Sequence, residues 1–431
     1  MSNKTVYVAM ATDVFHSGHI NIINNAAKYG KVTVGVLTDE AIATYKRQPF
    51  LDTAERVKIA EGFKHVERVV IQENLDYTDI LRRLKPDFVV HGDDWRTGHM
   101  QIIRERVLTV LEEWSGELIE IPYTQHLSGD KLSRQLSSTL TTPDQRLAKL
   151  KKLLHLKPYV RAIDTSNGLT GIIAENARIV DNATVKEFDA MWISSLCDSA
   201  FKGKPDIELV DLTSRINTIN EIMEVTSKPI ILDGDTGGKI DHFPFHVKTL
   251  ERIGVSAVII EDKTGLKQNS LFGTDVEQVL DDPEEFAAKI AAGKNAQVTR
   301  DFMIIARLES LIAGKSVDDA LMRAKIYIDA GADAIMIHSK EKTGEDIFSF
   351  IEQFRAYTTT VPLVAVPTTY NQFTEDELHK KGVNIIIHAN HLLRSAYPAM
   401  MKTAESILAN GRSKEASEAF CMPIKEVLNF I

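Results

Sequence analysis

Two apolar segments in the second half of the chain end in carboxylates. Asp233-Gly-Asp235 follows residues 229–232, and Glu261 follows residues 257–260. Carboxylate oxygens are ligands that hard cations prefer, and Mg²⁺ in proteins keeps several waters beside one or two carboxylates. The sequence therefore predicts a Mg²⁺ site formed by Asp233, Asp235 and Glu261. Two alternatives stay open, because the Asp-Gly-Asp loop could be a solvated turn and Glu261 could pair with Lys263.

A second group of polar residues lies near the N-terminus, in the segment Asp13-Val-Phe-His16-Ser-Gly18-His19. The segment follows an apolar run and precedes a helix that we expect to begin near Ile20. Free backbone N–H groups and the helix dipole favour negative charge at such a turn, so the segment predicts a site for a nucleotide phosphate. Histidines beside a turn can also do no more than satisfy local hydrogen bonds, and this alternative stays open.

The elements that must hold the N-terminal residues alternate between apolar runs and segments of helical period. The apolar runs, which predict strands, are residues 5–10, 32–37, 69–72, 88–91 and 118–122. This alternation is typical of βαβ units and a parallel sheet. A polar segment with a proline, residues 136–144, then precedes an amphipathic helix over 145–156. We therefore predict one domain over residues 1–140 and a second over 141–431.

The same alternation restarts in the second domain. Predicted strands cover residues 191–194, 229–232, 257–260, 303–307, 334–338, 363–366 and 384–387. Roughly seven or eight βα units over about 285 residues are typical of a (β/α)8 barrel, in which catalytic residues lie at the C-terminal ends of the strands. Polar residues do follow the apolar runs here: Ser194, Asp233, Asp235, Glu261, Arg307 and His338.

Composition limits the partners and the compartment. Lys and Arg number 51 and Asp and Glu 60, for a net charge of −9, which argues against nucleic-acid or anionic-membrane partners and leaves small molecules as the expected ones. The two cysteines, Cys197 and Cys421, are too few for a disulfide scaffold and lack metal-ligand spacing. The apolar stretch before Asp13 is too short for a signal peptide or a membrane span. We therefore expect a cytoplasmic protein.

Eight segments of the second domain carry a resemblance to a known family. They are N-G-L at Asn167, W-x-S-x-L at Trp192, D-x-D-T-G at Asp233, E-D-K-x-x-x-K-x-N-S at Glu261, A-R-L-E at Arg307, H-S-K at His338, V-P-T at Val366 and A-N-H-x-L-R at Ala389. With them, residues from about 150 to 400 resemble phosphoenolpyruvate mutase of the isocitrate lyase superfamily. The resemblance implies a barrel that interconverts phosphoenolpyruvate and phosphonopyruvate.

That resemblance also implies roles for individual residues. Mg²⁺ would be bound through Asp233, with Asp206, Asp235 and Glu261 acting directly or through water. The pyruvoyl pocket would be shaped by Trp192, Ser194, Ser195 and Leu196, where Ser195 replaces the usual Gly. The phosphoryl group would be surrounded by Lys267, Asn269, Ser270, Arg307 and His338, and the loop over residues 264–272 would exclude water.

Some alternatives remain for the barrel. Arg307 could pair internally with Glu309, and His338 could face the core. Superfamily lyases carry a cysteine on the loop over residues 264–272, and this loop has none, which disfavours a lyase. Phosphonopyruvate hydrolase activity stays open as an alternative to mutase activity.

The first domain also resembles a known family. Its D-x-x-H-x-G-H segment, T-D-E at Thr38 and G-D-D-W at Gly92 are similar to those of the nucleotidyltransferases with an HxGH signature, above all glycerol-3-phosphate cytidylyltransferase. The resemblance implies a Rossmann-like domain that uses CTP with Mg²⁺ and releases pyrophosphate. It assigns the triphosphate to His16 and His19 and charge neutralisation to Lys46. The remaining binding residues would be Asp13, Lys28, Asp94, Trp95 and Ser128.

Two departures from this family are visible. Met10-Ala11-Thr12 stands where the family has a glycine-rich start, and the segment from Tyr123 to Asp130 lacks the family's arginine. One alternative is therefore a nucleotide-binding module without transfer activity. For Asp94 and Trp95, the alternative is an ordinary turn with a half-buried aromatic ring.

The order of the two domains resembles the bifunctional cytidylyltransferase and phosphoenolpyruvate mutase enzymes of phosphonate biosynthesis, as in the fosfomycin pathway. This implies transfer of CMP to a phosphonate such as 2-hydroxyethylphosphonate, and an aminoethylphosphonate is equally compatible. The superfamily of the barrel usually forms tetramers that exchange a C-terminal helix. We therefore expect a homo-oligomer, dimer or tetramer, with the helix over 389–409 as the exchanged element.

Overall fold

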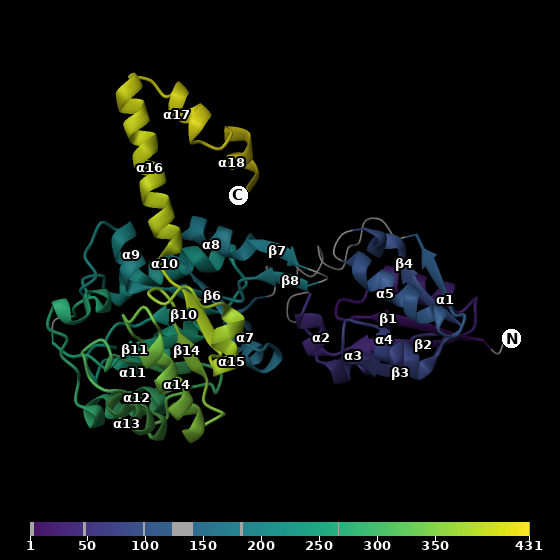
Figure 1. Cartoon of the computed structure of the whole chain (residues 1–431), viewed down its shortest axis with the longest axis horizontal. Coiled ribbons are helices and arrows are strands. Elements are labelled where there is room, and N and C mark those ends of the chain that lie inside the picture. Colours follow the sequence, from purple (N-terminus) through teal and green to yellow (C-terminus); the bar gives the residue numbers. More distant parts are fainter. Residues whose placement is uncertain are drawn as a thin grey trace. The chain divides into compact units, whose positions relative to one another are not determined.

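A computed structural model describes residues 4–45, 49–97, 100–122, 141–181, 184–265 and 267–430 (Figure 1). The chain forms two compact units: Met1–Val160 with Asn176–Asp189, and Arg161–Glu175 with Ala190–Ile431. This division places residues 141–160 in the first unit, whereas the sequence predicted a boundary after residue 140. That boundary adjoins residues outside the described ranges and stays a prediction.

The first unit contains a parallel sheet of five strands in the order β3-β2-β1-β4-β5. All five strands were predicted, with small differences at their ends. The strands are β1 (Thr5–Met10), β2 (Lys31–Leu37), β3 (Val66–Gln72), β4 (Phe88–Gly92) and β5 (Glu117–Ile121). The helices are α1 (Ser17–Ala26), α2 (Asp39–Ala43), α3 (Thr53–Glu61), α4 (Thr78–Leu84), the short η1 (Asp93–Arg96), α5 (Gln101–Glu112) and α7 (Pro143–Leu156).

Both faces of this sheet are buried, which explains the continuous apolar runs. Val6 and Val8 of β1 belong to one buried cluster, and Tyr7 and Ala9 belong to another. Successive side chains of a strand point to opposite faces, so each face of the sheet has its own core. In the sheet, β1 lies between β2 on one side and β4 on the other, so the strand order reverses direction at β1. The carboxyl ends of β1 and β4 therefore flank a switch point, where open α/β sheets bind ligands.

The second unit is a closed barrel with the strand order β10-β11-β12-β13-β14-β15-β6-β9. Seven of these strands were predicted, and the barrel itself is confirmed. The strands are β6 (Val160–Asp164), β9 (Ala190–Ile193), β10 (Ile230–Asp233), β11 (Ala257–Glu261), β12 (Met303–Leu308), β13 (Ala334–Ile337), β14 (Leu363–Ala365) and β15 (Ile385–His388). The sequence missed β6 because Arg161 interrupts its apolar run, and in the structure Arg161 pairs with Glu375.

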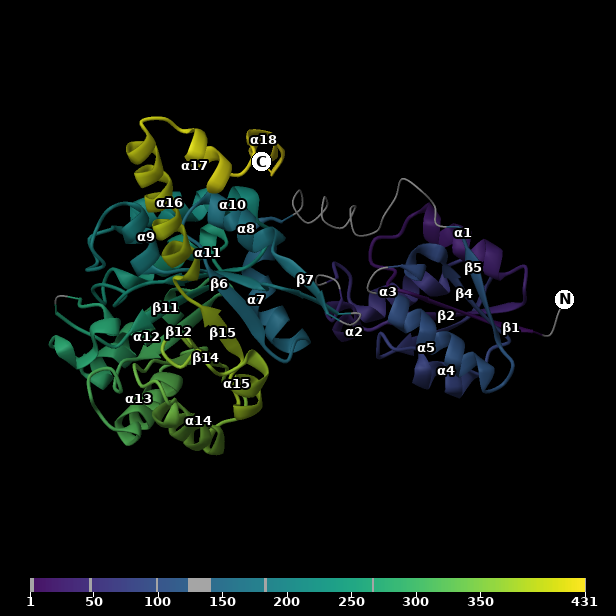
Figure 2. The same ribbon diagram turned by 45° about the horizontal axis from the view of Figure 1, so that its top comes forward.

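Helices follow the strands around the barrel (Figures 1 and 2). They are α8 (Gly168–Asn176), α9 (Ser195–Phe201), α10 (Leu212–Val225), α11 (Phe243–Ile253), η3 (Ser270–Asp275), α12 (Pro283–Ala296), α13 (Val317–Asp329), α14 (Glu345–Tyr357) and α15 (Glu375–Lys381). An antiparallel hairpin that the sequence did not predict, β7 (Arg178–Asp181) with β8 (Thr184–Glu187), is inserted after α8. Within the described ranges, no helix has the length and apolarity needed to cross a bilayer.

The chain ends in α16 (His391–Asn410), α17 (Lys414–Ala419) and α18 (Ile424–Phe430). The helix predicted over residues 389–409 is thus confirmed as α16. Both views show α16, in yellow, projecting away from the barrel (Figures 1 and 2), and none of its described residues is buried.

Candidate active sites

The carboxyl ends of the barrel strands bring the predicted residues together around one pocket. The ends of β9 to β13 supply Ser194, Asp233, Glu261, Arg307 and His338. Every barrel residue predicted from the sequence lines this pocket except Asp235. The lining residues are Asp164, Trp192, Ser194, Ser195, Leu196, Asp206, Asp233, Glu261, Lys267, Asn269, Ser270, Leu271, Arg307, His338, Val366, Thr368, Ala389 and Asn390.

The start of α9 fixes one wall of the pocket. Ser194 is the N-cap of α9, and its Oγ accepts a hydrogen bond from Cys197 N at 3.1 Å. The same hydroxyl donates to Asp164 Oδ2 at 2.8 Å, and that carboxylate also accepts Asn390 N at 2.9 Å. Asp164 therefore ties together the ends of β6, β9 and β15. Sequence reasoning missed it because β6 was missed, although its place just before the Asn167 motif was a usable signal.

The Asp-Gly-Asp loop after β10 is tightly packed. A Cβ atom on Gly234 would lie 2.7 Å from Val258 Cγ2, so only glycine fits between the two aspartates. Asp235 adopts a positive φ of 55° and donates its backbone N–H to Asp233 Oδ1 at 3.1 Å. Ser195 donates to Asp233 Oδ2 through its hydroxyl at 3.1 Å. Asp233 is therefore held rigidly at the centre of the pocket.

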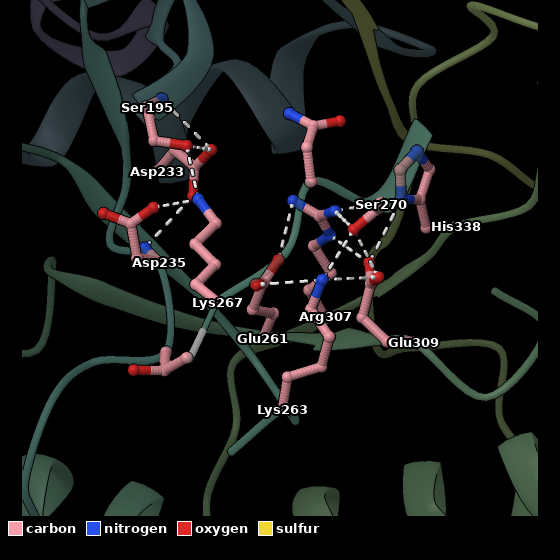
Figure 3. Close-up of polar contacts among 12 residues, drawn as sticks. Ser195, Asp233, Asp235, Glu261, Lys263, Lys267, Ser270, Arg307, Glu309 and His338 are labelled. Carbon is pink, nitrogen blue, oxygen red and sulfur yellow. Dashed lines mark hydrogen bonds and ion pairs between the residues drawn. The ribbon is translucent and has the colours of Figure 1, made fainter. Parts of the chain in front are cut away.

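Lys267 of the loop after β11 points into this group of oxygens (Figure 3). Its Nζ donates to Ser195 Oγ at 2.8 Å and to Asp206 Oδ1 at 3.0 Å, and it also contacts Asp235 Oδ1. Asn269 Nδ2 donates to Asp206 Oδ2 at 2.6 Å. Only 4% of Lys267 is exposed, so its side chain is buried among these oxygens.

A second network surrounds Arg307 on the other side of the pocket (Figure 3). Its guanidinium contacts Glu309 Oε1 at 2.5 Å, Ser270 Oγ at 2.7 Å and His338 Nδ1 at 3.0 Å. Glu261 Oε2 lies 3.3 Å from Nη1. The pairing of Arg307 with Glu309, which the sequence left open as an alternative, is therefore present. Arg307 still lines the pocket, because Glu309 binds its Nε and leaves the rest of the guanidinium facing the pocket.

The charges of these buried groups are strongly perturbed. Although burial works to raise it, the charges of Lys267, Arg307 and Arg215 hold the pKa of Asp233 at about 2. Burial raises the pKa of Glu261 to about 7, against the opposing charges of Arg307 and Lys267. Burial also lowers the pKa of His338, and the charge of Arg307 lowers it further. The pocket therefore holds a permanent anion at Asp233, a neutral imidazole, and a carboxyl that titrates near neutrality.

The pocket suits a hydrated divalent cation better than a fully protein-coordinated one. In the described part of the chain, no three His, Cys, Asp or Glu side chains form a group that could hold a metal. Asp235 does not line the pocket, because it pairs with Arg215 and Lys267. Among the described residues, the carboxylate oxygens of Glu261 make no hydrogen bond, but they form ion pairs with Lys263 at 3.2 Å and with Arg307 at 3.3 Å. The pairing of Glu261 with Lys263, which the sequence left open as an alternative, is therefore present. The carboxylates of Asp233 and Glu261 line the pocket and, with water, match the coordination habit of Mg²⁺. The metal site predicted from Asp233, Asp235 and Glu261 stays a prediction.

In the first unit, the two histidines cap α1. His16 Nδ1 accepts a hydrogen bond from Gly18 N at 3.1 Å, and His19 Nδ1 accepts one from His16 N at 3.3 Å. A ring nitrogen that accepts from a backbone N–H carries no proton, so each neutral ring carries its proton on Nε2. Both rings are half-buried, with centroids 4.2 Å apart. The local hydrogen bonds that the sequence left open as an alternative are therefore present. They also fix the direction in which the two Nε2–H groups point.

A buried arginine that the sequence did not single out fixes the strand ends around this turn. Arg56 donates through Nη1 to Ala11 O at 2.7 Å and Leu37 O at 2.6 Å, and through Nε to Leu51 O at 3.0 Å. Asp13 Oδ1 accepts the backbone N–H groups of residues 50 and 51 at 2.7 and 3.0 Å. Asp13 therefore anchors the segment that directly precedes α3.

The other residues predicted for this site are dispersed. Lys28 lies beyond the C-terminal end of α1 and bonds Asn25, about 18 Å along the helix from His16, so the structure does not bring it to the turn. Trp95 is 1% exposed, stacks on His91 and donates from Nε1 to Glu120 at 2.9 Å, so it lies in the core. Asp94 is half-exposed at the end of β4. Lys46 and Ser128 lie outside the described residues.

Two protein families match separate parts of this chain. Residues 150–408 match the family model of phosphoenolpyruvate phosphomutase. The chain belongs to the phosphoenolpyruvate phosphomutase family. Residues 12–140 match the model of cytidylyltransferase-like domains. The predicted joining of a cytidylyltransferase-like domain to a phosphoenolpyruvate mutase barrel is therefore confirmed, and with it an enzyme of the isomerase and nucleotidyltransferase classes.

Similar proteins of this family include both mutases and a hydrolase. A phosphoenolpyruvate phosphomutase of Tetrahymena pyriformis is 36% identical over 264 residues, which are 61% of this chain and 84% of the relative. A phosphonopyruvate hydrolase of Variovorax sp. is 36% identical over 269 residues, or 62% and 91%. A solved structure of a phosphonopyruvate hydrolase in complex with oxalate and Mg²⁺ has 33% sequence identity to this chain and a TM-score of 0.58. The match covers 67% of this chain and 94% of the hydrolase chain.

Proposed function

We propose that the barrel interconverts phosphoenolpyruvate and phosphonopyruvate. The observation that carries the proposal is the convergence of Lys267, Arg307 and His338 on one pocket beside Asp233, whose pKa is held at about 2. In the reaction the bond from phosphorus to the enol oxygen breaks and a bond from phosphorus to the methylene carbon forms. A loosely bound phosphoryl group spreads negative charge over its oxygens, and such a group requires cationic and hydrogen-bonding partners.

The residues would divide this task by position. Asp233, and Glu261 directly or through water, would hold Mg²⁺, which supplies Lewis-acid stabilisation of the enolate and carboxylate oxygens when bound. Ser194, Trp192 and Leu196 would enclose the pyruvoyl group. On the phosphoryl group, Arg307 would supply charge and Asn269 and Ser270 would supply hydrogen bonds. The loop that carries Lys267 would exclude water, because water would intercept the phosphoryl group.

Hydrolysis of phosphonopyruvate is the second candidate for the barrel. It is favoured by the hydrolase relative at 36% identity, which equals the identity to a mutase. A ³¹P NMR time course of the protein with phosphonopyruvate and Mg²⁺ separates the two. Appearance of phosphoenolpyruvate supports the mutase, whereas inorganic phosphate in its place contradicts it and supports the hydrolase. Asp233→Ala is the control, which should yield neither product.

We further propose that the first unit transfers CMP from CTP to a downstream phosphonate and releases pyrophosphate. The support is the pair of Nε2–H donors that His16 and His19 present at the start of α1, beside the switch point of the sheet. Transfer of this kind is catalysed mainly by positioning and charge stabilisation. The acceptor would be 2-hydroxyethylphosphonate or an aminoethylphosphonate, and Mg²⁺ would accompany the nucleotide.

Pyrophosphate release from CTP tests this second proposal. The protein is incubated with CTP, Mg²⁺ and each of the two phosphonates, with ATP and GTP as comparison nucleotides. Release that depends on CTP and one phosphonate supports the transfer. If CTP binds in calorimetry but no phosphonate elicits pyrophosphate, the first unit is instead a nucleotide-binding module.

We also infer a cytoplasmic homo-oligomer, in which the exposed helix α16 packs on another copy. The support is the absence of buried side chains along α16 among its described residues. Light scattering on the purified protein gives the number of copies, and removal of residues 391–431 should reduce it. An unchanged mass would contradict the role of α16.

A further inference from the structure

Asp262 follows Glu261 directly and is a fully buried acid that the reaction outlined above does not use. Its Oδ1 accepts the backbone N–H of Glu309 at 2.8 Å. Its Oδ2 accepts the hydroxyl of Tyr327 at 2.8 Å and Nη1 of Arg323 at 3.2 Å. Tyr327 and Arg323 belong to α13, one of the helices around the barrel (Figure 1). Asp262 therefore joins this helix to the segment that follows β12.

The same helix holds that segment at a second point. Ser310, the residue after Glu309, donates its hydroxyl to Asp319 Oδ2 at 2.7 Å. Arg323 Nε donates to the same oxygen at 3.2 Å, and Arg323 Nη1 donates to the hydroxyl of Tyr327 at 3.1 Å. Glu309 and Ser310 are both fully buried. The backbone of Glu309 is therefore fixed by hydrogen bonds that end on α13.

The side chain of Glu309 connects this support to the pocket (Figure 3). Its Oε1 lies 2.5 Å from Arg307 Nε and 3.1 Å from His338 Nδ1. Its Oε2 accepts the hydroxyl of Ser270 at 2.5 Å. Arg307, His338 and Ser270 all line the pocket. The position of one buried carboxylate therefore sets the orientation of three pocket groups.

We propose that Asp262 is a positioning residue for the groups that bind the phosphoryl group. Held by α13, it fixes the backbone of Glu309, and Glu309 fixes the groups in the pocket. Such alignment is important for the rate, since a displacement of about 1 Å can lower it about 10²-fold. The inference rests on the proposed function only in assigning Arg307, His338 and Ser270 to the phosphoryl oxygens.

The metal side of the pocket has supports of its own. Asp233 is held by the hydroxyl of Ser195 and the backbone N–H of Asp235. Glu261 lines the pocket, whereas Asp262 contacts α13, as expected when successive side chains at a strand end point to opposite sides. A change at Asp262 should therefore alter binding of a phosphonate and leave binding of a metal chelator nearly unchanged.

Two ligands test the two sides separately by calorimetry on the full chain with Mg²⁺. Oxalate presents two carboxylates and no phosphonate. The other ligand, 3-phosphonopropionate, presents a carboxylate and a phosphonate, and it cannot react because it lacks the keto group. Arg307→Met removes the central cation of the phosphoryl side, so it identifies the part of the phosphonate binding that belongs to the barrel.

The variants at Asp262 differ in what they keep. Asp262→Leu keeps the approximate size but removes both acceptors, whereas Asp262→Asn keeps an oxygen for the N–H of Glu309. Tyr327→Phe removes one partner of Asp262 and nothing else. The matched control is Tyr7→Phe, because Tyr7 is also buried and donates its hydroxyl to Gln72 Oε1 at 2.5 Å, in the first unit.

We expect Asp262→Leu to raise the Kd of 3-phosphonopropionate at least about tenfold and to leave that of oxalate within about twofold. Asp262→Asn should keep both values within about threefold of wild type. Tyr327→Phe should raise the Kd of 3-phosphonopropionate about threefold, and should add nothing in the double variant with Asp262→Leu, because it acts through Asp262. Tyr7→Phe should change neither value.

Two results would overturn the proposal. One is unchanged binding of 3-phosphonopropionate in Asp262→Leu. The other is an equal loss of oxalate binding, since Asp262 would then act on Glu261 or on the barrel as a whole. Circular dichroism shows whether Asp262→Leu folds. If it does not, Tyr327→Phe decides alone, and an unchanged Kd for 3-phosphonopropionate in that variant overturns the proposal.

Turnover of phosphonopyruvate gives a separate readout. In Asp262→Leu we expect kcat to fall about 10-fold to 10²-fold, while the Mg²⁺ concentration for half the maximal rate stays within about twofold. If the wild type binds 3-phosphonopropionate but forms neither phosphoenolpyruvate nor phosphate, the proposed function fails, and the Kd values still decide the role of Asp262. If the wild type does not bind 3-phosphonopropionate, or Arg307→Met binds it equally well, the inference itself is overturned.

Discussion

The barrel pocket and the histidine turn differ in what supplies their hydrogen-bond donors and charge. In the barrel, buried side chains from several strands, helices and loops form ion networks, and carboxylates hold Arg307 and Lys267 in place. At the turn, the two histidines are half-buried, and backbone N–H groups at the start of one helix orient their rings. A site made of ion pairs between residues far apart in the sequence forms only when the whole barrel is folded. The hydrogen bonds at the start of α1 join residues two or three positions apart, so they depend mainly on the local backbone. The two sites should therefore respond differently to single substitutions.

The largest expected effect is on the barrel. Asp233→Asn keeps the shape of the side chain but removes the anion at the centre of the pocket, so interconversion of phosphonopyruvate and phosphoenolpyruvate should fall by about 10³-fold or more. Pyrophosphate release from CTP should be unchanged. Both rates can be read by ³¹P NMR on one sample, and a parallel loss of the two would show that the sites are coupled.

A smaller effect is expected at His16, whose two roles can be tested separately: it caps α1, and it is proposed to bind the triphosphate. His16→Asn retains an N-cap acceptor but loses Nε2–H, so pyrophosphate release should fall about 10²-fold to 10³-fold with little change in stability. His16→Ala loses both functions, and should also lose about 1 kcal/mol of stability. Calorimetry and a coupled pyrophosphate assay measure the two quantities. Full activity of His16→Asn would assign the histidine to the cap alone.

A substitution of Glu120 measures how much its ion pairs and hydrogen bonds contribute to the stability of the first unit. Hydrogen bonds from Arg104, Arg96 and Trp95 lower the pKa of Glu120 to about 2, against a usual 4.5. A carboxylate with a depressed pKa stabilises the fold above pH 4.5, and this contribution is lost as the pH falls from 4.5 toward 2. Glu120→Gln should therefore cost about 1–2 kcal/mol at pH 7, after allowance for the exposed Arg96, and almost nothing at pH 2.

The matched control for Glu120→Gln is Glu113→Gln, which removes an exposed pair with Arg82. It should cost much less than Glu120→Gln at pH 7, because an ion pair in water contributes little to stability. Urea unfolding of the full chain at pH 7 and pH 2 gives these differences. Equal losses in the two variants would mean that the Trp95–Glu120 contact adds nothing to the surface pairs.

The smallest effect is expected at Thr12, which adopts a positive φ of 54°. A β-branched residue is strained in this region, so Thr12→Gly should raise stability by up to about 1 kcal/mol while CTP turnover persists. Ser115→Gly, at a φ of 59° away from the turn, is the comparison. The melting temperature measures both, and a lower value for Thr12→Gly alone would assign a packing role to its side chain.

Most of the fold was predictable because strand signals in a buried parallel sheet are local. Continuous apolar runs marked all five strands of the sheet and seven of the barrel strands. The strand β6 was missed because its charged Arg161 is neutralised by Glu375, 214 residues later in the chain. The hairpin of β7 and β8 was missed as well, since its short strands are partly polar and exposed.

The barrel site was predictable to a similar extent, since residues that follow parallel strands must meet at one end of a barrel. This reasoning brought Asp233, Glu261, Arg307 and His338 together correctly. It did not distinguish Asp235, whose carboxylate turns from the pocket toward Arg215. At the turn, sequence proximity suggested that Lys28 belonged with His16, but a helix of ten residues separates them.

The sequence by itself determined the periodicity of the elements, the capped helix starts and the set of groups that could do chemistry. These depend on the backbone and on neighbours a few residues away, so they can be inferred from local patterns. Only the tertiary structure decided which carboxylates face the pocket and which are neutralised. The contacts of Asp164 with Asn390 and of Lys267 with Ser195 join residues 226 and 72 positions apart. The charge and orientation of a buried group depend on such partners, because burial leaves no water to stabilise it.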